Sequence, residues 1–179
     1  MNKFFPIVLA LLFFSCDEGA SNLSKAANKN ETKKKSPKSN KNKTETFEQQ
    51  LNKINGIRNW YVGYIWNEGI NDIKSYLKEG TNSIGEKFDV EFCIRNLNKE
   101  LKKLNDYNQY INNLDGKIFS DIKYSWNKMH NKIIEIQGWI NSHSITPNFK
   151  GAIFEASILN QYFDAFDRSM EELEQTVNE

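Results

Sequence analysis

Apolar residues recur every third or fourth position through most of the chain after residue 46. The regular spacing is clearest from Val90 to Leu114, where Asn108 takes the one polar position in the apolar stripe. The turn residues Asp115-Gly116 follow, and the same spacing resumes from Ile118 to Ile140. Such a pattern places the apolar side chains on one face of an α-helix. We therefore expect two long amphipathic helices that pack antiparallel across a short turn.

A further helix is predicted before this pair. The residues from Thr46 to Gln49 fit a capping box, in which the threonine hydroxyl accepts a bond from a first-turn amide and the glutamine side chain reaches back to the amide of the capping residue. The helix should begin there and end at Gly80. Glycine within a helix costs about 1 kcal/mol relative to alanine, so Gly63 and Gly69 predict a bend or interruption near Trp60 to Trp66.

The last predicted helix is marked by Thr146-Pro147, a capping residue followed by a proline suited to the first helical position. Apolar spacing then continues through Ile153 to Leu173. Nothing from residue 47 onward alternates convincingly with period two, so no strand is expected. The predicted fold is an all-α antiparallel bundle of about four helices, formed by residues 47–179. A domain of that length can bury a core without disulfide bonds or a metal.

The residues before the bundle have the pattern of targeting and spacing segments. Lys3 precedes an apolar run from Phe4 to Phe14, and Ser15-Cys16 follows at once, so residues 1–15 are predicted to be a signal peptide. The run is too short to cross a bilayer as a permanent helix. Residues 17–46 are mostly Asn, Lys, Ser and Thr with few large apolar side chains, and we expect a disordered tether there.

Charge is divided unevenly along the sequence. Residues 17–46 carry eight lysines against four acids, whereas residues 47–179 carry fifteen basic residues against nineteen acids. Nucleic acid binding depends on clustered lysine or arginine that neutralises several phosphates. The mildly acidic helical domain is therefore not expected to bind nucleic acid. The lysines of the tether could contact anionic lipid or glycan, although a solvated spacer is the more frequent role of such a segment.

No catalytic, cofactor or metal site is predicted. The two histidines, His130 and His143, lie thirteen residues apart, one on a predicted helix and one in a loop, which is not a metal-ligand spacing. No glycine-rich phosphate loop follows a strand. Cys93 lies within a strongly periodic segment and is expected to be a buried, inert thiol. We expect a protein that is not an enzyme.

Aromatic residues are numerous, at 23 of 179. They gather between Trp60 and Trp66, and Tyr107 and Tyr110 lie near the end of the second helix. Most are expected in the core. Any that are exposed are suited to anchoring a protein interface, because they supply large contact area at low entropic cost.

The residues Leu12-Phe13-Phe14-Ser15-Cys16 resemble the lipobox of bacterial lipoproteins, in which the cysteine is lipidated and becomes the new N-terminus. Phe13 holds the place where the commonest pattern has leucine, a looseness typical of spirochaetes. Together with the Asn- and Lys-rich tether and helical domain, this resembles surface lipoproteins of Lyme and relapsing-fever spirochaetes, and in layout the factor H-binding protein A type. The resemblance implies lipidation at Cys16 and an outer-membrane, cell-surface location.

The same resemblance implies recruitment of a host complement regulator such as factor H, or of plasminogen. An adhesin for host matrix or glycan, or a structural surface protein, is the alternative. No binding motif of the group can be transferred to this sequence. On geometry alone, a loop far from the tether is a candidate contact point, and we assign partner binding there to His143, Ser144 and Asn148. Oligomeric state is left open.

Overall fold

The structure is a computed structural model and describes residues 45–176. The predicted signal peptide and Cys16 lie outside the described residues, as does the predicted tether except for Glu45 and Thr46. Between residues 45 and 176 every regular element is a helix and no strand is present. The expected all-α class is confirmed.

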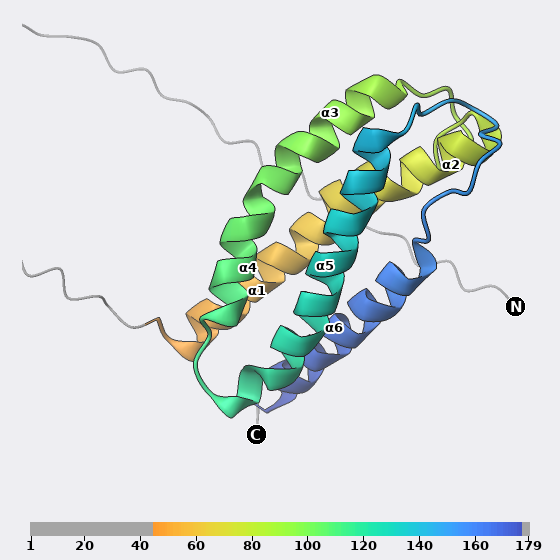
Figure 1. The fold of residues 1–179 in the computed structure, drawn as a ribbon. Coiled ribbons are helices and arrows are strands. Elements are labelled where there is room, and N and C mark those ends of the chain that lie inside the picture. Colours follow the sequence, from red (N-terminus) through yellow and green to blue (C-terminus); the bar gives the residue numbers. More distant parts are fainter. Residues whose placement is uncertain (1–44, 177–179) are drawn as a thin grey trace, which may run out of the picture. The chain divides into compact units, whose positions relative to one another are not determined.

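Four helical segments follow one another along the chain (Figure 1). The first is made of α1 (Phe47–Trp60), the π-helical η1 (Tyr61–Asn71) and α2 (Asp72–Glu79). The second is made of α3 (Val90–Glu100), the 3-10 turn η2 (Leu101–Lys103) and α4 (Leu104–Asn112). The third is η3 (Lys117–Phe119) with α5 (Ser120–Ser142), and the fourth is α6 (Ser157–Gln175).

Side-chain contacts join these segments in a closed ring around one apolar core. The core takes buried side chains from every segment, among them Ile65, Leu97, Ile133 and Phe166. The joining pairs around the ring are Trp60 with Tyr107, Asn112 with Asn127, Trp126 with Phe166, and Asp167 with Arg58. The expected four-helix antiparallel bundle is the observed architecture.

Both ends of the first segment are where the sequence predicted them. The Thr46 hydroxyl accepts a bond from the amide of Gln49, and the Gln49 side chain accepts one from the amide of Thr46. At the other end Gly80 adopts the left-handed conformation, with φ of 79°, and donates to the carbonyl of Tyr76. That conformation is strained for residues with a Cβ atom, so glycine suits this cap.

The interruption expected near Trp60 to Trp66 is the π-helical stretch η1, which begins at Tyr61. Most π-helical segments are a single turn inside an α-helix, so eleven residues is a long stretch. Gly69 lies where η1 meets α3, and a Cβ atom there would come within 2.9 Å of Leu97 Cδ1. The glycine therefore allows the two helices to approach closely.

The prediction that the fourth helix begins at Thr146-Pro147 is wrong, because α6 begins only at Ser157. The intervening segment is held by tertiary contacts instead. The amide of Phe149 donates to the carbonyl of Leu77, at 2.8 Å, and Asn148 has a positive φ of 53°. Phe149 and a second aromatic residue of the segment, Phe154, pack against Trp139 of α5. These contacts outweigh the local preference of Thr146-Pro147 for starting a helix.

Candidate functional site

His143, the first of the residues assigned to partner binding, directly follows the last residue of α5. Its ring stacks on the indole of Trp139, with centroids 4.1 Å apart and planes 9° apart. Its Nδ1 lies 2.8 Å from the Trp139 carbonyl oxygen and 3.1 Å from the Ser142 hydroxyl. Although the residue is exposed, one face of the imidazole is covered, so the histidine is held in place by the end of the helix.

Ser144 and Asn148 lie on the same loop as His143, and both are exposed. The loop is held against α2 by the bond from Phe149 to Leu77, and Pro147 lies beside Gly80. In Figure 1 this loop lies at the end of the bundle opposite the start of α1. The three residues share one loop, but among residues 45–176 no side-chain hydrogen bond or ring contact links His143, Ser144 and Asn148 to one another.

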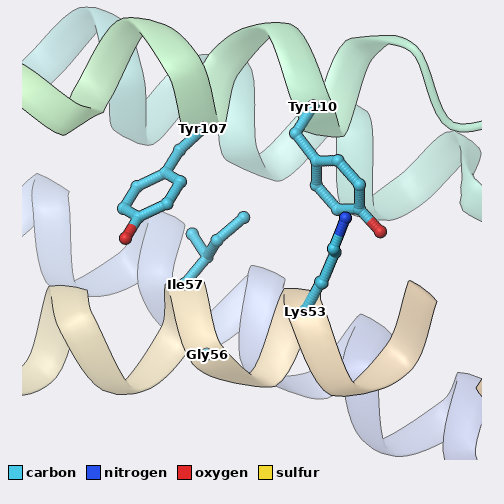
Figure 2. A pocket seen from close by; sticks show the side chains of 5 residues that line it. All are labelled: Lys53, Gly56, Ile57, Tyr107 and Tyr110. Carbon is cyan, nitrogen blue, oxygen red and sulfur yellow. The ribbon is translucent and has the colours of Figure 1, made fainter. Parts of the chain in front are cut away.

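A second candidate site lies between α1 and α4 (Figure 2). We call it the aromatic groove and define it by Lys53, Gly56, Ile57, Tyr107 and Tyr110, which line a hollow of about 370 Å³. Ligand sites commonly have volumes of about 300 to 1,000 Å³. Figure 2 shows the two tyrosines projecting from α4 toward the lysine and isoleucine of α1. A Cβ atom at Gly56 would meet no atom within 4 Å, so the glycine leaves space that another residue would fill.

The walls of the aromatic groove differ in chemistry. At one end the ring of Tyr107 meets that of Trp60 edge to face, at a centroid distance of 4.9 Å. At the other end the Lys53 ammonium lies 4.9 Å from the ring centroid of Tyr110 and pairs with the carboxylate of Glu45. The Tyr110 hydroxyl donates to the second oxygen of that carboxylate, at 3.0 Å. One end of the groove is therefore apolar, and the other holds the carboxylate of Glu45.

These contacts set the acid-base properties of the polar end. The bond from Lys53 holds the pKa of Glu45 below its ordinary value, and the bond from Tyr110 acts in the same direction. Burial raises the pKa of the Tyr110 hydroxyl, and the neighbouring Glu45 carboxylate raises it further. At neutral pH the arrangement is an ionised carboxylate held by an ammonium and a protonated phenol.

A smaller hollow of about 200 Å³ continues along the same pair of helical segments. Its lining includes Tyr64, which is 49% exposed, and Glu100. Glu100 accepts bonds from Lys103, at 2.6 Å, and from the indole of Trp60, at 3.1 Å. The lysine also keeps the pKa of Glu100 low. Aromatic and charged side chains are thus in contact at both hollows on this side of the bundle.

The aromatic cluster noted in the sequence divides between core and surface. Trp60 and Tyr61 are buried, whereas Tyr64 is exposed and Tyr107 and Tyr110 are half-buried. Sequence reasoning missed the groove because it did not pair α1 with α4. The available signal was Gly56, a helical glycine with no capping role, near Lys53 and Ile57 on the same helix.

The remaining residues singled out in the sequence have structural surroundings. Cys93 is buried, and its thiol donates to the Glu68 carbonyl at 3.1 Å. Burial raises the pKa of this thiol to about 12, which agrees with the expected inert role. Among residues 45–176 no group of three or more His, Cys, Asp and Glu side chains is placed to hold a metal ion. In the same range no helix combines the length and apolar character needed to cross a membrane.

No protein-family model matches the chain, and the comparisons with curated proteins and with solved structures found no similar protein.

Proposed function

We propose that this chain is a lipid-anchored bacterial surface protein whose helical bundle binds a soluble host serum protein. The observation that carries the proposal is the aromatic groove, a preformed hollow with tyrosine walls and one ammonium. Tyrosine is enriched among the residues that contribute most to protein interfaces, and such residues cluster in well-packed pockets from which water is excluded. A rigid helical scaffold lowers the entropic cost of binding, because little of it has to be ordered.

The membrane part of the proposal rests on the signal peptide and Cys16 of the sequence. Several acyl chains on one cysteine hold a protein durably on a membrane, where a single chain does not. The location proposed is the outer membrane, with the bundle at the cell surface. Complement regulator factor H is the first partner to test, and plasminogen the second.

The test starts from lipid-free residues 17–179, immobilised and exposed to diluted human serum. Retained proteins are identified by mass spectrometry, and purified factor H and plasminogen are then titrated over the same surface. The proposal expects a saturable one-to-one complex with one of them. An empty serum column, together with binding to immobilised matrix or self-association, would overturn it in favour of the adhesin or structural alternative.

Two sets of variants locate the surface. Gly56→Leu fills the aromatic groove. The triple variant His143→Ala, Ser144→Ala and Asn148→Ala instead removes the three side chains of the loop after α5 that were assigned to partner binding. If the groove carries binding, the first variant weakens the complex and the triple variant does not. Loss of binding in the triple variant alone would restore the loop as the contact surface. Gly138→Leu is the matched control, because Gly138 is also helical, exposed and open around its Cβ position.

A further inference from the structure

The polar end of the aromatic groove already holds a carboxylate. Lys53 pairs with one oxygen of Glu45 and the Tyr110 hydroxyl donates to the other, at 3.0 Å. Each oxygen thus has its own donor, and the two donors come from different helices. Because charge-assisted hydrogen bonds to a carboxylate are stronger than neutral ones, this pair of donors is suited to selecting an acid.

The apolar part of the groove lies beside this carboxylate site. Ile57 is 3% exposed, and Tyr107 is braced by Trp60. The hollow of about 370 Å³ persists with Glu45 in place, and the space around the Cβ position of Gly56 is open. Glu45 therefore occupies the carboxylate position, but it has no apolar group that could fill the space beside it.

Glu45 can leave the groove without unfolding α1. It precedes the N-cap, and the capping bonds are made by Thr46 and Gln49. The Glu45 side chain is 32% exposed, and that of Lys53 is 55% exposed. A competing carboxylate would therefore exchange one surface ion pair for another, while an attached apolar group would gain burial that Glu45 does not provide.

We propose that the aromatic groove binds an acidic peptide segment of a partner protein, in which a carboxylate lies next to a branched apolar side chain, and that Glu45 is an internal competitor for the carboxylate position. The inference rests on the proposed function in one respect, because it takes the acidic segment to belong to the protein that the bundle captures. Its recognition chemistry stands on the groove alone. While Glu45 occupies the carboxylate position, an external acid cannot bind there, so the apparent affinity is reduced in proportion to the fraction of chains in which the position is free. Removing Glu45 should restore the full affinity.

The test is an amide NMR titration of lipid-free residues 17–179 with two acidic probes. N-acetyl-leucine presents a terminal carboxylate, and acetyl-Leu-Glu-amide presents a side-chain carboxylate. The neutral counterparts are N-acetyl-leucinamide and acetyl-Leu-Gln-amide, and N-acetylglycine lacks the apolar group. We expect saturable shifts at Gly56, Ile57 and Tyr107 with at least one acidic probe, and binding at least about tenfold weaker for its neutral counterpart. The stronger acidic probe identifies the source of the carboxylate.

Variants test each part of the groove separately. Glu45→Gln should tighten binding of the acidic probe by about three- to tenfold, because the competitor is gone. Gly56→Leu should weaken it by about tenfold or more by filling the hollow, and Lys53→Met should weaken it by removing the ammonium. Gly138→Leu should bind like the unaltered chain.

Equal affinity for acidic and neutral probes would overturn the inference, as would the absence of saturable shifts even in Glu45→Gln. Unchanged affinity in Glu45→Gln would overturn the role of Glu45 as competitor. Because no serum is used, these failures are distinguishable from failure of the proposed function. A chain that captures a serum protein but binds no acidic probe keeps the function and loses this site.

Discussion

The second helical segment packs against α5 along one side and against α1 along the other, and the two seams are built from different chemistry. On the α5 side, amide side chains pair across the helices. Asn98 donates to Asn141 and Asn112 exchanges two bonds with Asn127. Asn98 and Asn112 are fourteen residues apart on the second segment, and Asn127 and Asn141 are also fourteen residues apart on α5, which is about four helical turns. This seam therefore fixes the antiparallel register.

On the α1 side, the contacts are aromatic and ionic and leave a hollow. Trp60 meets Tyr107, Lys53 covers Tyr110, and the space at Gly56 is open. The comparison indicates how one helix can serve two purposes. A seam with filled space and paired amides stabilises one arrangement, whereas a seam with aromatic walls and an open glycine leaves a surface that a partner can use.

The largest effect is expected where the filled seam meets the core. Trp126 is fully buried, contacts Phe166 and donates its indole proton to Asn108, at 3.1 Å. Trp126→Ala should lower the free energy of unfolding by about 3 to 5 kcal/mol, because it creates a cavity and leaves the amide without its donor. Urea unfolding followed by far-UV circular dichroism measures the change.

The matched control for this variant is Tyr124→Ala on the same helix. Tyr124 is 68% exposed, so its loss should change stability by no more than about 0.5 kcal/mol. A loss below about 1 kcal/mol for Trp126→Ala would contradict the view that this seam carries much of the stability.

Two glycines sharpen the comparison along the α1 side itself. Gly69 is closed in, since a Cβ atom added there would lie 2.9 Å from Leu97 Cδ1 and 3.0 Å from the carbonyl oxygen of Tyr64, whereas Gly56 is open. Gly69→Ala should destabilise the fold by about 1 to 3 kcal/mol through overpacking. Gly56→Ala should stabilise it by about 0.5 to 1 kcal/mol through helix propensity. Destabilisation by both variants in thermal unfolding would show that the groove is not open at Gly56.

A gain in stability is also expected at Tyr61, whose ring stacks on Phe163 of α6. Its hydroxyl is buried and has no hydrogen-bond partner among the described residues. Tyr61→Phe should raise the free energy of unfolding by about 1 kcal/mol, because it removes an unsatisfied polar group. Tyr124→Phe, at an exposed ring, is the control and should have no measurable effect. Destabilisation by Tyr61→Phe would mean that the hydroxyl is satisfied.

Much of the fold follows from local patterns. The apolar spacing from Val90 to Leu114 predicted a helical face, and the side chain at its polar position, Asn108, accepts the hydrogen bond of the buried Trp126 indole. The caps at Thr46 and Gly80 are local signals and were predicted correctly. Each depends on residues within one turn, where sequence and structure are directly linked.

What the sequence did not reveal depends on distant contacts. The start of α6 was misplaced because the bond from Phe149 to Leu77 joins residues far apart in sequence. Ile118 was placed on the apolar stripe, but the 3-10 turn η3 leaves it 51% exposed and buries Phe119 instead. The groove was missed for the same reason, since it exists only once α1 lies beside α4.

The finest distinction between the two seams is their response to pH. Amides do not titrate, so the cost of Asn127→Ala should be the same at acidic and neutral pH. Glu45 on the α1 side does titrate, and the bond from Lys53 lowers its pKa from an ordinary 4.5. A lowered folded pKa means that the stabilisation is fully present above about 4.5 and is lost as the pH falls through the folded value. Carbon-detected NMR of the Glu45 carboxyl should therefore give a midpoint below 4.5, and Lys53→Met should raise it. An unchanged midpoint in Lys53→Met would show that the ammonium does not hold the carboxylate, and the polar end of the groove would lose its basis for selecting an acid.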